Sequence, residues 1–217
     1  MDPPGDNERA PAAPGSVPSQ RIQCERLVLR CWHPGDAPLF KRALDASLPE
    51  LQRWIPWARE EPSALPVIAE RLSGYREDFL AGRNALYAVM DLEETDVLGG
   101  AGLYRRVGPG ALEIGYWVRS DQAGRGFATE ATAALTREGF TLSGIERIEI
   151  HCNRANLASA AIPRKLGYVH REDGPGQGAS PPPTAGGTMV WEMTREGYER
   201  AKGALAYTRT KGHSTEA

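Results

Sequence analysis

The chain has 217 residues, of which 41% are hydrophobic and 25% charged, the composition of an ordinary globular domain. Its formal net charge of -2 at pH 7 gives no support for a surface that binds nucleic acid or anionic membranes. Its apolar runs are too short to span a bilayer, and its first residues lack the basic and apolar regions of a signal peptide.

Taken in chain order, residues 1–20 are rich in Pro, Ala, Gly and Ser and predict a disordered N-terminal tail. The single folded domain is expected at 21–207, with a polar C-terminal tail at 208–217. Alternating apolar residues predict a first strand at 25–32. Asp36 is then placed to cap a helix that runs to about residue 46.

Two tryptophans and two prolines at 48–57 predict a short helix followed by a turn. Ser63 is expected to cap a long helix that ends before Gly82. Three further segments, 86–91, 97–104 and 112–118, predict an antiparallel meander with short connections.

The second half of the chain alternates between helices and strands. Helices are predicted at 128–142, 156–166 and 195–206, and strands at 146–152, 168–171 and 188–193. A Gly- and Pro-rich stretch at about 173–187 is expected to be a flexible insertion. This order predicts a single mixed α/β (α+β) domain with helices flanking a mostly antiparallel sheet.

A glycine turn joins the strand at 112–118 to the helix at 128–142 and contains Gly124 and Gly126. The first turn of a helix presents unpaired backbone N–H groups and partial positive charge, which together favour a phosphate or pyrophosphate. The turn is not a Walker loop, because no Gly-Lys-Ser/Thr follows, and Thr129 stands where a dinucleotide-binding motif has its third glycine.

Four motifs in register give this turn a context: 26–30, 113–117, 124–131 and 156–168. With them the chain resembles the GCN5-related N-acetyltransferase (GNAT) superfamily, in its RimJ/RimL-type branch, over roughly 25–193. The resemblance implies acetyl-CoA as co-substrate, no metal, and a sheet whose two central strands splay apart around the pantetheine arm.

The resemblance also implies the residues that bind the cofactor. Pantetheine would lie along the backbone of Tyr116, Trp117 and Val118, and Asn156 would hydrogen-bond to it. Backbone N–H groups would hold the pyrophosphate, and they belong to Gly124, Arg125, Gly126, Phe127, Ala128 and Thr129. The family usually has Gln or Arg where this chain has Ala123, so one side-chain contact is expected to be missing.

Ser159 matches the family's serine near the CoA sulfur, where it would protonate or order the leaving thiolate; a hydroxyl bonded back to its own helix is the structural alternative. Glu113 is the predicted general base, although an ordinary strand carboxylate explains it equally well. His33 and His151 are weaker alternatives for the base. Glu130 is interpreted as structural, because it favours the helix dipole.

The acceptor side is expected to include Trp32, Trp57 and Tyr87, whereas Trp54 is assigned to the core. The chain is thus predicted to be a cytoplasmic enzyme that transfers an acetyl group to a primary amine. That amine is a protein N-terminal α-amine or a small molecule such as an antibiotic or metabolite. A non-catalytic acyl-CoA-binding module is the alternative. No nucleic-acid or membrane partner is expected, and both a monomer and a homodimer remain open.

Three cysteines, Cys24, Cys31 and Cys152, form neither a CxxC pair nor a cluster with histidine. An odd number without a secretion signal is typical of a reduced cytosolic protein. We interpret them as small packing residues.

Overall fold

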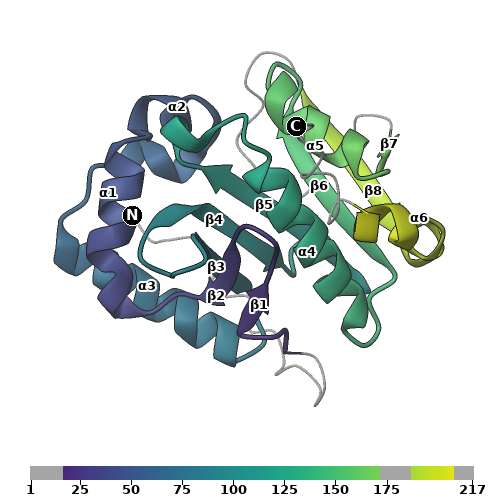
Figure 1. Ribbon diagram of the computed structural model, residues 1–217, viewed down its shortest axis with the longest axis horizontal. Helices are drawn as coiled ribbons and strands as arrows, with labels where there is room; N and C mark the ends of the chain where they lie inside the picture. The colour runs from purple at the N-terminus through teal and green to yellow at the C-terminus, as the bar shows by residue number, and fades with distance from the viewer. Residues whose placement is uncertain (1–16, 172–186, 208–217) are drawn as a thin grey trace, which may run out of the picture.

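In the computed structural model, which describes residues 17–171 and 187–207, eight strands form one sheet in the order β1-β2-β3-β4-β5-β6-β8-β7 (Figure 1). The strands are β1 (Arg21–Gln23), β2 (Val28–Cys31), β3 (Ala85–Met90), β4 (Val97–Tyr104), β5 (Ala111–Val118), β6 (Arg147–Asn153), β7 (Val169–Arg171) and β8 (Thr188–Thr194). The predicted tails at 1–16 and 208–217 and the predicted insertion at 173–186 lie outside the described residues.

The central strands β5 and β6 are the one parallel pair among the described strands. Their pairing covers only Ala111–Glu113 and Arg147–Glu149, although β5 continues to Val118 and β6 to Asn153. Beyond that point β5 remains paired with β4, and β6 remains paired with β8. The two strands therefore splay apart, as the sequence predicts.

Helices cover both faces of the sheet. They are α1 (Ala37–Asp45), α2 (Leu48–Trp54), α3 (Leu65–Leu80), α4 (Phe127–Thr141), α5 (Leu157–Lys165) and α6 (Arg195–Tyr207), with short 3₁₀ turns η1 (Pro34–Asp36), η2 (Pro56–Glu60) and η3 (Ser120–Gln122). Helix α4 lies over β4, β5 and β6, and α1 to α3 gather beside the first strands (Figure 1). Alternate side chains of β3 enter separate cores: Tyr87 belongs to the α4 side, and Ala88 to the α1–α3 side.

The N-terminal edge begins earlier than predicted. Strand β1 was missed, because three residues with one apolar side chain carry no readable pattern, and its place is set by pairing with β2. Residues 17–20, predicted as part of the tail, also make specific contacts. Tyr87 donates its hydroxyl to the Ser19 carbonyl (2.9 Å), and the Ser19 N–H donates to Glu138 (2.6 Å).

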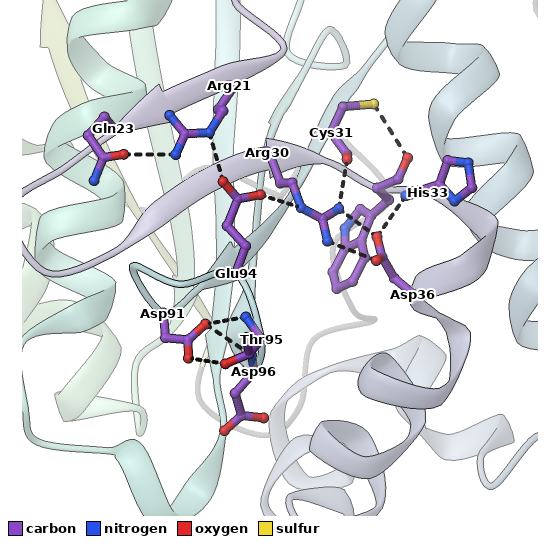
Figure 2. Close-up of polar contacts among 11 residues, drawn as sticks. Arg21, Gln23, Arg30, Cys31, His33, Asp36, Asp91, Glu94, Thr95 and Asp96 are labelled. Atoms are coloured by element: carbon purple, nitrogen blue, oxygen red, sulfur yellow. Dashed lines mark hydrogen bonds and ion pairs between the residues drawn. The ribbon is translucent and has the colours of Figure 1, made fainter.

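Asp36 precedes α1 but its side chain makes no capping hydrogen bond to that helix, so this prediction is wrong. Its carboxylate instead accepts two hydrogen bonds from Arg30 (2.7 and 2.8 Å) and one from the His33 N–H (2.9 Å). Arg30 also pairs with Glu94, which in turn pairs with Arg21 (Figure 2). This network fastens β1 and β2 to η1 and to the turn after β3.

The start of α3 also differs from the prediction. Ser63 does not cap it; the helix begins at Leu65, and the Ser63 N–H donates to the Glu61 carboxylate (2.6 Å). The predicted end is confirmed, because Gly82 follows the helix with a φ of 68° and donates to the Phe79 carbonyl (3.0 Å).

Candidate active site

Two cavities meet at the fork between β5 and β6. The glycine-turn cavity, about 470 Å³, is lined by η3, the turn, the start of α4 and α5. The aromatic cavity, about 340 Å³, is lined by α2, η2, β3, β4 and β5. Six residues line both: Trp54, Ile55, Tyr116, Trp117, His151 and Ser159. The two cavities therefore adjoin each other at these six residues.

The glycine turn has the local geometry that the sequence predicts. Gly124 has a φ of 76° and Gly126 a φ of 84°, a region that side-chain-bearing residues avoid. Helix α4 starts directly after Gly126, and Glu130 is the residue whose N–H bonds back to the Gly126 carbonyl (3.0 Å). The N–H groups of Ala128 and Thr129 therefore have no acceptor within the helix, and both residues line the glycine-turn cavity. An anion there gains these donors and the helix dipole.

An ion pair holds the turn from outside the cavity. Glu130 accepts a hydrogen bond from the Arg26 N–H (2.8 Å) and pairs with the Arg26 guanidinium (2.8 Å). That guanidinium also donates to the Arg125 carbonyl (2.8 Å). Glu130 therefore has the structural role that the sequence suggests.

Side-chain chemistry is sparse at the turn itself. Arg125 is exposed, and its side chain donates to Gln122 (2.5 Å) without lining either cavity. Ala123 lines the glycine-turn cavity with only a methyl group. The donors that this turn offers to an anion are therefore backbone N–H groups.

The backbone of β5 offers donors to the gap left by the splay. Arg119 donates its N–H to Leu98 on β4 (2.8 Å), and N–H groups alternate in direction along a strand. The N–H of Trp117 therefore also points toward β4, whereas those of Tyr116 and Val118 point toward the gap. Of the three residues predicted for the pantetheine backbone, Trp117 thus has its N–H directed toward β4, and it lines both cavities.

Gly100 makes room for the indole side chain of Trp117. A Cβ on Gly100 would lie 2.5 Å from Nε1 of Trp117, which excludes a side chain there. Gly99 and Gly100, which weaken β4 as a strand pattern, therefore leave room for Trp117 on the neighbouring strand.

Ser159 lies at the junction of the cavities and contacts Tyr116 across the fork. The Tyr116 hydroxyl is 3.1 Å from both the carbonyl oxygen and the hydroxyl of Ser159. Asn156 caps α5 by accepting the Ser159 N–H (3.0 Å), and it also lines the glycine-turn cavity. Burial raises the pKa of Tyr116, so its hydroxyl keeps its proton at neutral pH.

Glu113, the predicted base, is engaged in a bidentate ion pair. Its two oxygens accept from Nε (2.7 Å) and a terminal nitrogen (2.6 Å) of Arg106, and its side chain is 3% exposed. Nδ1 of His151 is 4.0 Å from a Glu113 oxygen. The carboxylate therefore belongs to a buried charge cluster rather than standing free.

His151 completes that cluster from β6. Its Nε2 lies 2.7 Å from Glu149, which also accepts from Arg147 (2.8 Å). Burial opposes the charged form of Glu149, but the hydrogen bonds from His151 and Arg147 outweigh it and lower the pKa of this carboxyl. The other ring nitrogen, Nδ1, is buried and has no hydrogen-bond partner among the described residues.

The aromatic residues predicted for the acceptor all lie along the aromatic cavity, but to different degrees. Trp32 is 2% exposed and packs edge-on against Phe40 (5.1 Å between ring centres), and Tyr87 is fully buried. Trp57 is 37% exposed and offers the most surface of the three. Trp54, assigned to the core, is partly exposed and lines both cavities, so that assignment is wrong.

Sequence reasoning gave His151 little weight and missed Glu149 and Arg106. A signal was present, because Arg147, Glu149 and His151 alternate along one strand and must share a face of the sheet. The sequence alone does not indicate that this face of β6 lies beside Glu113.

Two kinds of feature, a metal-binding cluster and a membrane-crossing helix, are absent from the described residues. Among residues 17–171 and 187–207, no group of three or more His, Cys, Asp or Glu side chains is placed to hold a metal ion. Within the same ranges no helix combines the length and the apolar character that crossing a membrane requires.

Similarity to known proteins identifies the family in which this geometry occurs. The family model described as "Acetyltransferase (GNAT) domain" matches residues 26–169. The YdaF protein of Bacillus subtilis (strain 168), named provisionally as a ribosomal N-acetyltransferase, is 25% identical over 152 residues, which are 67% of this chain and 79% of that protein.

Solved structures share the fold at low sequence identity. One is RimL, a ribosomal L7/L12 alpha-N-protein acetyltransferase in complex with coenzyme A: TM-score 0.71, 17% identity, 82% of this chain and 99% of that one. Another is the microcin C7 self-immunity acetyltransferase MccE with acetyl-CoA and AMP: TM-score 0.71, 14% identity, 82% of this chain and 98% of that one.

Proposed function

Because the chain belongs to the acetyltransferase (GNAT) family, we propose that it transfers an acetyl group from acetyl-CoA to the α-amine at the N-terminus of a protein. The observation that carries the proposal is the junction of the two cavities. The glycine-turn cavity supplies an anion site and a splayed strand pair, and it meets the aromatic cavity at Ser159 and Tyr116.

In this proposal the diphosphate of acetyl-CoA lies against the N–H groups from Gly124 to Thr129. The pantetheine arm follows the gap beside β5, where the N–H groups of Tyr116 and Val118 and the side chain of Asn156 face it. The acetyl thioester then lies near Ser159, where the cavities meet. The N–H of Val118 is placed to stabilise negative charge that develops on the thioester oxygen.

The leaving sulfur needs a proton or a hydrogen bond. Ser159 is proposed to supply it, with the Tyr116 hydroxyl, 3.1 Å away, behind it. Pro163 occupies the position where many GNAT proteins have a tyrosine. Tyr116, on β5, instead places a phenol hydroxyl beside the same helix, α5.

The acceptor amine is proposed to enter through the aromatic cavity. Trp54 and Trp57 give it a partly exposed apolar rim, and Glu113 and His151 lie at its inner end beside the junction. An N-terminal α-amine as acceptor is supported by the description of RimL as an alpha-N-protein acetyltransferase, and a ribosomal acceptor by the name of YdaF.

A second acceptor, a small-molecule amine, is favoured by the structural likeness to MccE and by the many aromatic rings of a cavity of only about 340 Å³. Either acceptor uses the same cofactor site. We also propose a cytoplasmic location, which the three free cysteines support.

The test has two parts. Acetyl-CoA should raise the melting temperature of the purified chain, and the Gly126→Trp variant should lose that shift. Release of free thiol is then measured with peptides bearing a free α-amine, the same peptides acetylated at the N-terminus, and a panel of small primary amines.

We expect thiol release only with the free peptides. Release with small amines alone would favour the second acceptor. Thermal protection without release for any acceptor would support the non-catalytic module, and no protection would refute the cofactor site.

A further inference from the structure

We infer that His151 is the general base of the transfer reaction and that Glu149 is the positioning residue that holds its imidazole. The inference rests on the proposed function, because it names the group that takes the proton of the acceptor amine. It starts from one unexplained feature: a buried ring nitrogen at the junction of the cavities with no partner among the described residues.

The hydrogen bond to Glu149 decides which nitrogen of His151 can act as a base. Glu149 is a charged acceptor at neutral pH, because its pKa is lowered, so Nε2 carries the hydrogen across the 2.7 Å contact. In the neutral imidazole, Nδ1 is then the nitrogen that carries the lone pair and can accept a proton.

The position of His151 also suits the role. It is one of the residues that line both cavities, and its side chain is 4% exposed. Ser159, which lines both cavities as well, stands beside the sulfur in the proposed function. A base on β6 and an acid on α5 therefore meet a thioester at the junction from two different elements.

Glu113 is less suited to accept the proton. Both of its oxygens are held by Arg106, at 2.6 and 2.7 Å. With both oxygens already accepting hydrogen bonds from arginine, this carboxylate is less available to the proton of an amine. Its better role is to stabilise the imidazolium, since one of its oxygens is 4.0 Å from Nδ1.

The charges around His151 balance on each packed element. On the β5 side Glu113 is paired with Arg106, and on β6 itself Glu149 is paired with Arg147. On β8 Glu192 pairs with Arg171. A neutral His151 leaves these pairs compensated, and the cation formed during the reaction has carboxylates at both ring nitrogens.

The proposed step is balanced. The neutral amine nitrogen forms a bond to the thioester carbon, and the carbon–sulfur bond breaks with its electron pair going to sulfur. One N–H proton moves from nitrogen to Nδ1 of His151. The thiolate takes a proton from the Ser159 hydroxyl, which is replenished from solvent through the Tyr116 hydroxyl, and His151 returns its proton to solvent.

The experiment compares three variants on the acceptor that releases thiol with the wild-type chain, so a failure of the proposed function would already show in the wild type. His151→Gln should lower kcat/KM by about 10²-fold or more and remove the rising limb of the pH–rate profile. Its affinity for acetyl-CoA should stay within about twofold of wild type. His170→Gln, on the exposed edge strand β7, is the matched control and should leave rate and profile unchanged.

Glu149→Gln separates positioning from packing. The amide still accepts the Nε2 hydrogen but no longer stabilises the imidazolium, so the rising limb should move to lower pH while kcat falls. The inference would be overturned if the rising limb of the pH–rate profile stayed unchanged in Glu149→Gln. A wild-type kcat/KM in His151→Gln would overturn it as well.

Imidazole nitrogen NMR of the wild-type chain keeps the inference testable if a variant fails to fold. The signal of His151 should report the Nε2–H form at neutral pH. The Nδ1–H form would overturn the assignment of Nδ1 as the base, whatever the activity data show.

Discussion

Glu113 on β5 and Glu149 on β6 lie directly opposite each other at the last paired position of the two parallel strands. Like charges in register across a sheet repel. Here each carboxylate has its own arginine, Arg106 and Arg147 respectively, and His151 lies next to both. The splay that opens the cofactor gap therefore begins at a compensated charge cluster.

Breaking this cluster should be costly. Arg106→Ala leaves Glu113 as a buried carboxylate without its partner, and we expect the free energy of unfolding to fall by about 3 kcal/mol. Urea unfolding measures it. Lys41→Ala, which removes a more exposed pair with Asp45, should cost less than about 1 kcal/mol. Equal losses of unfolding free energy in the two variants would show that the buried pair contributes no more to stability than the exposed pair.

The glycine turn gives a prediction that links strain to binding. Gly126→Ala places a Cβ at a φ of 84°, where the strain is on the order of 1–2 kcal/mol, and distorts the N–H groups that face the anion. Unfolding stability should fall, and the Kd for acetyl-CoA measured by calorimetry should rise.

Gly74→Ala is the control for this variant. Gly74 lies in α3 with open space around its Cα, so alanine should stabilise the helix by up to about 1 kcal/mol. Binding of acetyl-CoA should not change. Wild-type affinity in Gly126→Ala would place the diphosphate elsewhere.

The contact between Tyr116 and Ser159 predicts a shared effect on turnover. Removing either hydroxyl, by Tyr116→Phe or Ser159→Ala, should lower kcat by about 10²-fold while the affinity for acetyl-CoA changes little. The double variant should lose little more than either single variant, because the two hydroxyls act as one unit. Steady-state thiol release measures this.

Tyr168→Phe is the matched control for that pair. It removes a buried tyrosine hydroxyl 2.7 Å from Thr136, a residue that lines neither cavity. We expect a stability loss of about 1 kcal/mol and an unchanged kcat. Full turnover in both Tyr116→Phe and Ser159→Ala would remove the proposed proton donor.

Asp36 predicts how stability depends on pH. Burial alone would raise its pKa, but hydrogen bonds from Arg30 and from the His33 backbone outweigh burial and lower the pKa below the ordinary value. In the pH range between the folded and unfolded values the unfolded chain binds more protons, so stability rises with pH. This contribution is complete above about pH 4 and is lost as the pH falls through the folded pKa.

Urea unfolding between about pH 3 and pH 7 checks the sign of the Asp36 effect. Asp36→Asn should be less stable at neutral pH and should lose less stability on acidification than the wild-type chain. Asp45→Asn, which removes an exposed carboxylate paired with Lys41, should follow the wild-type curve. A steeper acid loss in Asp36→Asn would contradict the role of this carboxylate.

Local features of the chain were readable from the sequence. Strand β4 was predicted with its observed bounds, and α4 to within one residue, because periodicity reflects burial along a single element. Gly124 and Gly126 were recognised because they stand in a turn between a predicted strand and a predicted helix, where unpaired backbone N–H groups favour an anion. Four motifs in order identified the family.

The errors share one cause. Asp36 and Ser63 have residue types that favour helix caps, but other partners bind the Asp36 side chain and the Ser63 backbone: Arg30 from β2 and Glu61, the residue after η2. Strand β1 has no pattern of its own and exists through pairing with β2. Local preference is worth about 1 kcal/mol, and a buried ion pair or a sheet edge readily outweighs it.

The sequence by itself determined most of the elements, the glycine turn before α4 and the membership of an acetyltransferase family, since these depend on neighbours along the chain. Only the tertiary structure decided how the reactive groups are arranged. It paired Glu113 with Arg106, left Nδ1 of His151 unpartnered among the described residues, and brought Tyr116 to Ser159 across the fork. Such contacts depend on strand register and splay between distant segments, and a shift of one residue would turn each side chain to the opposite face.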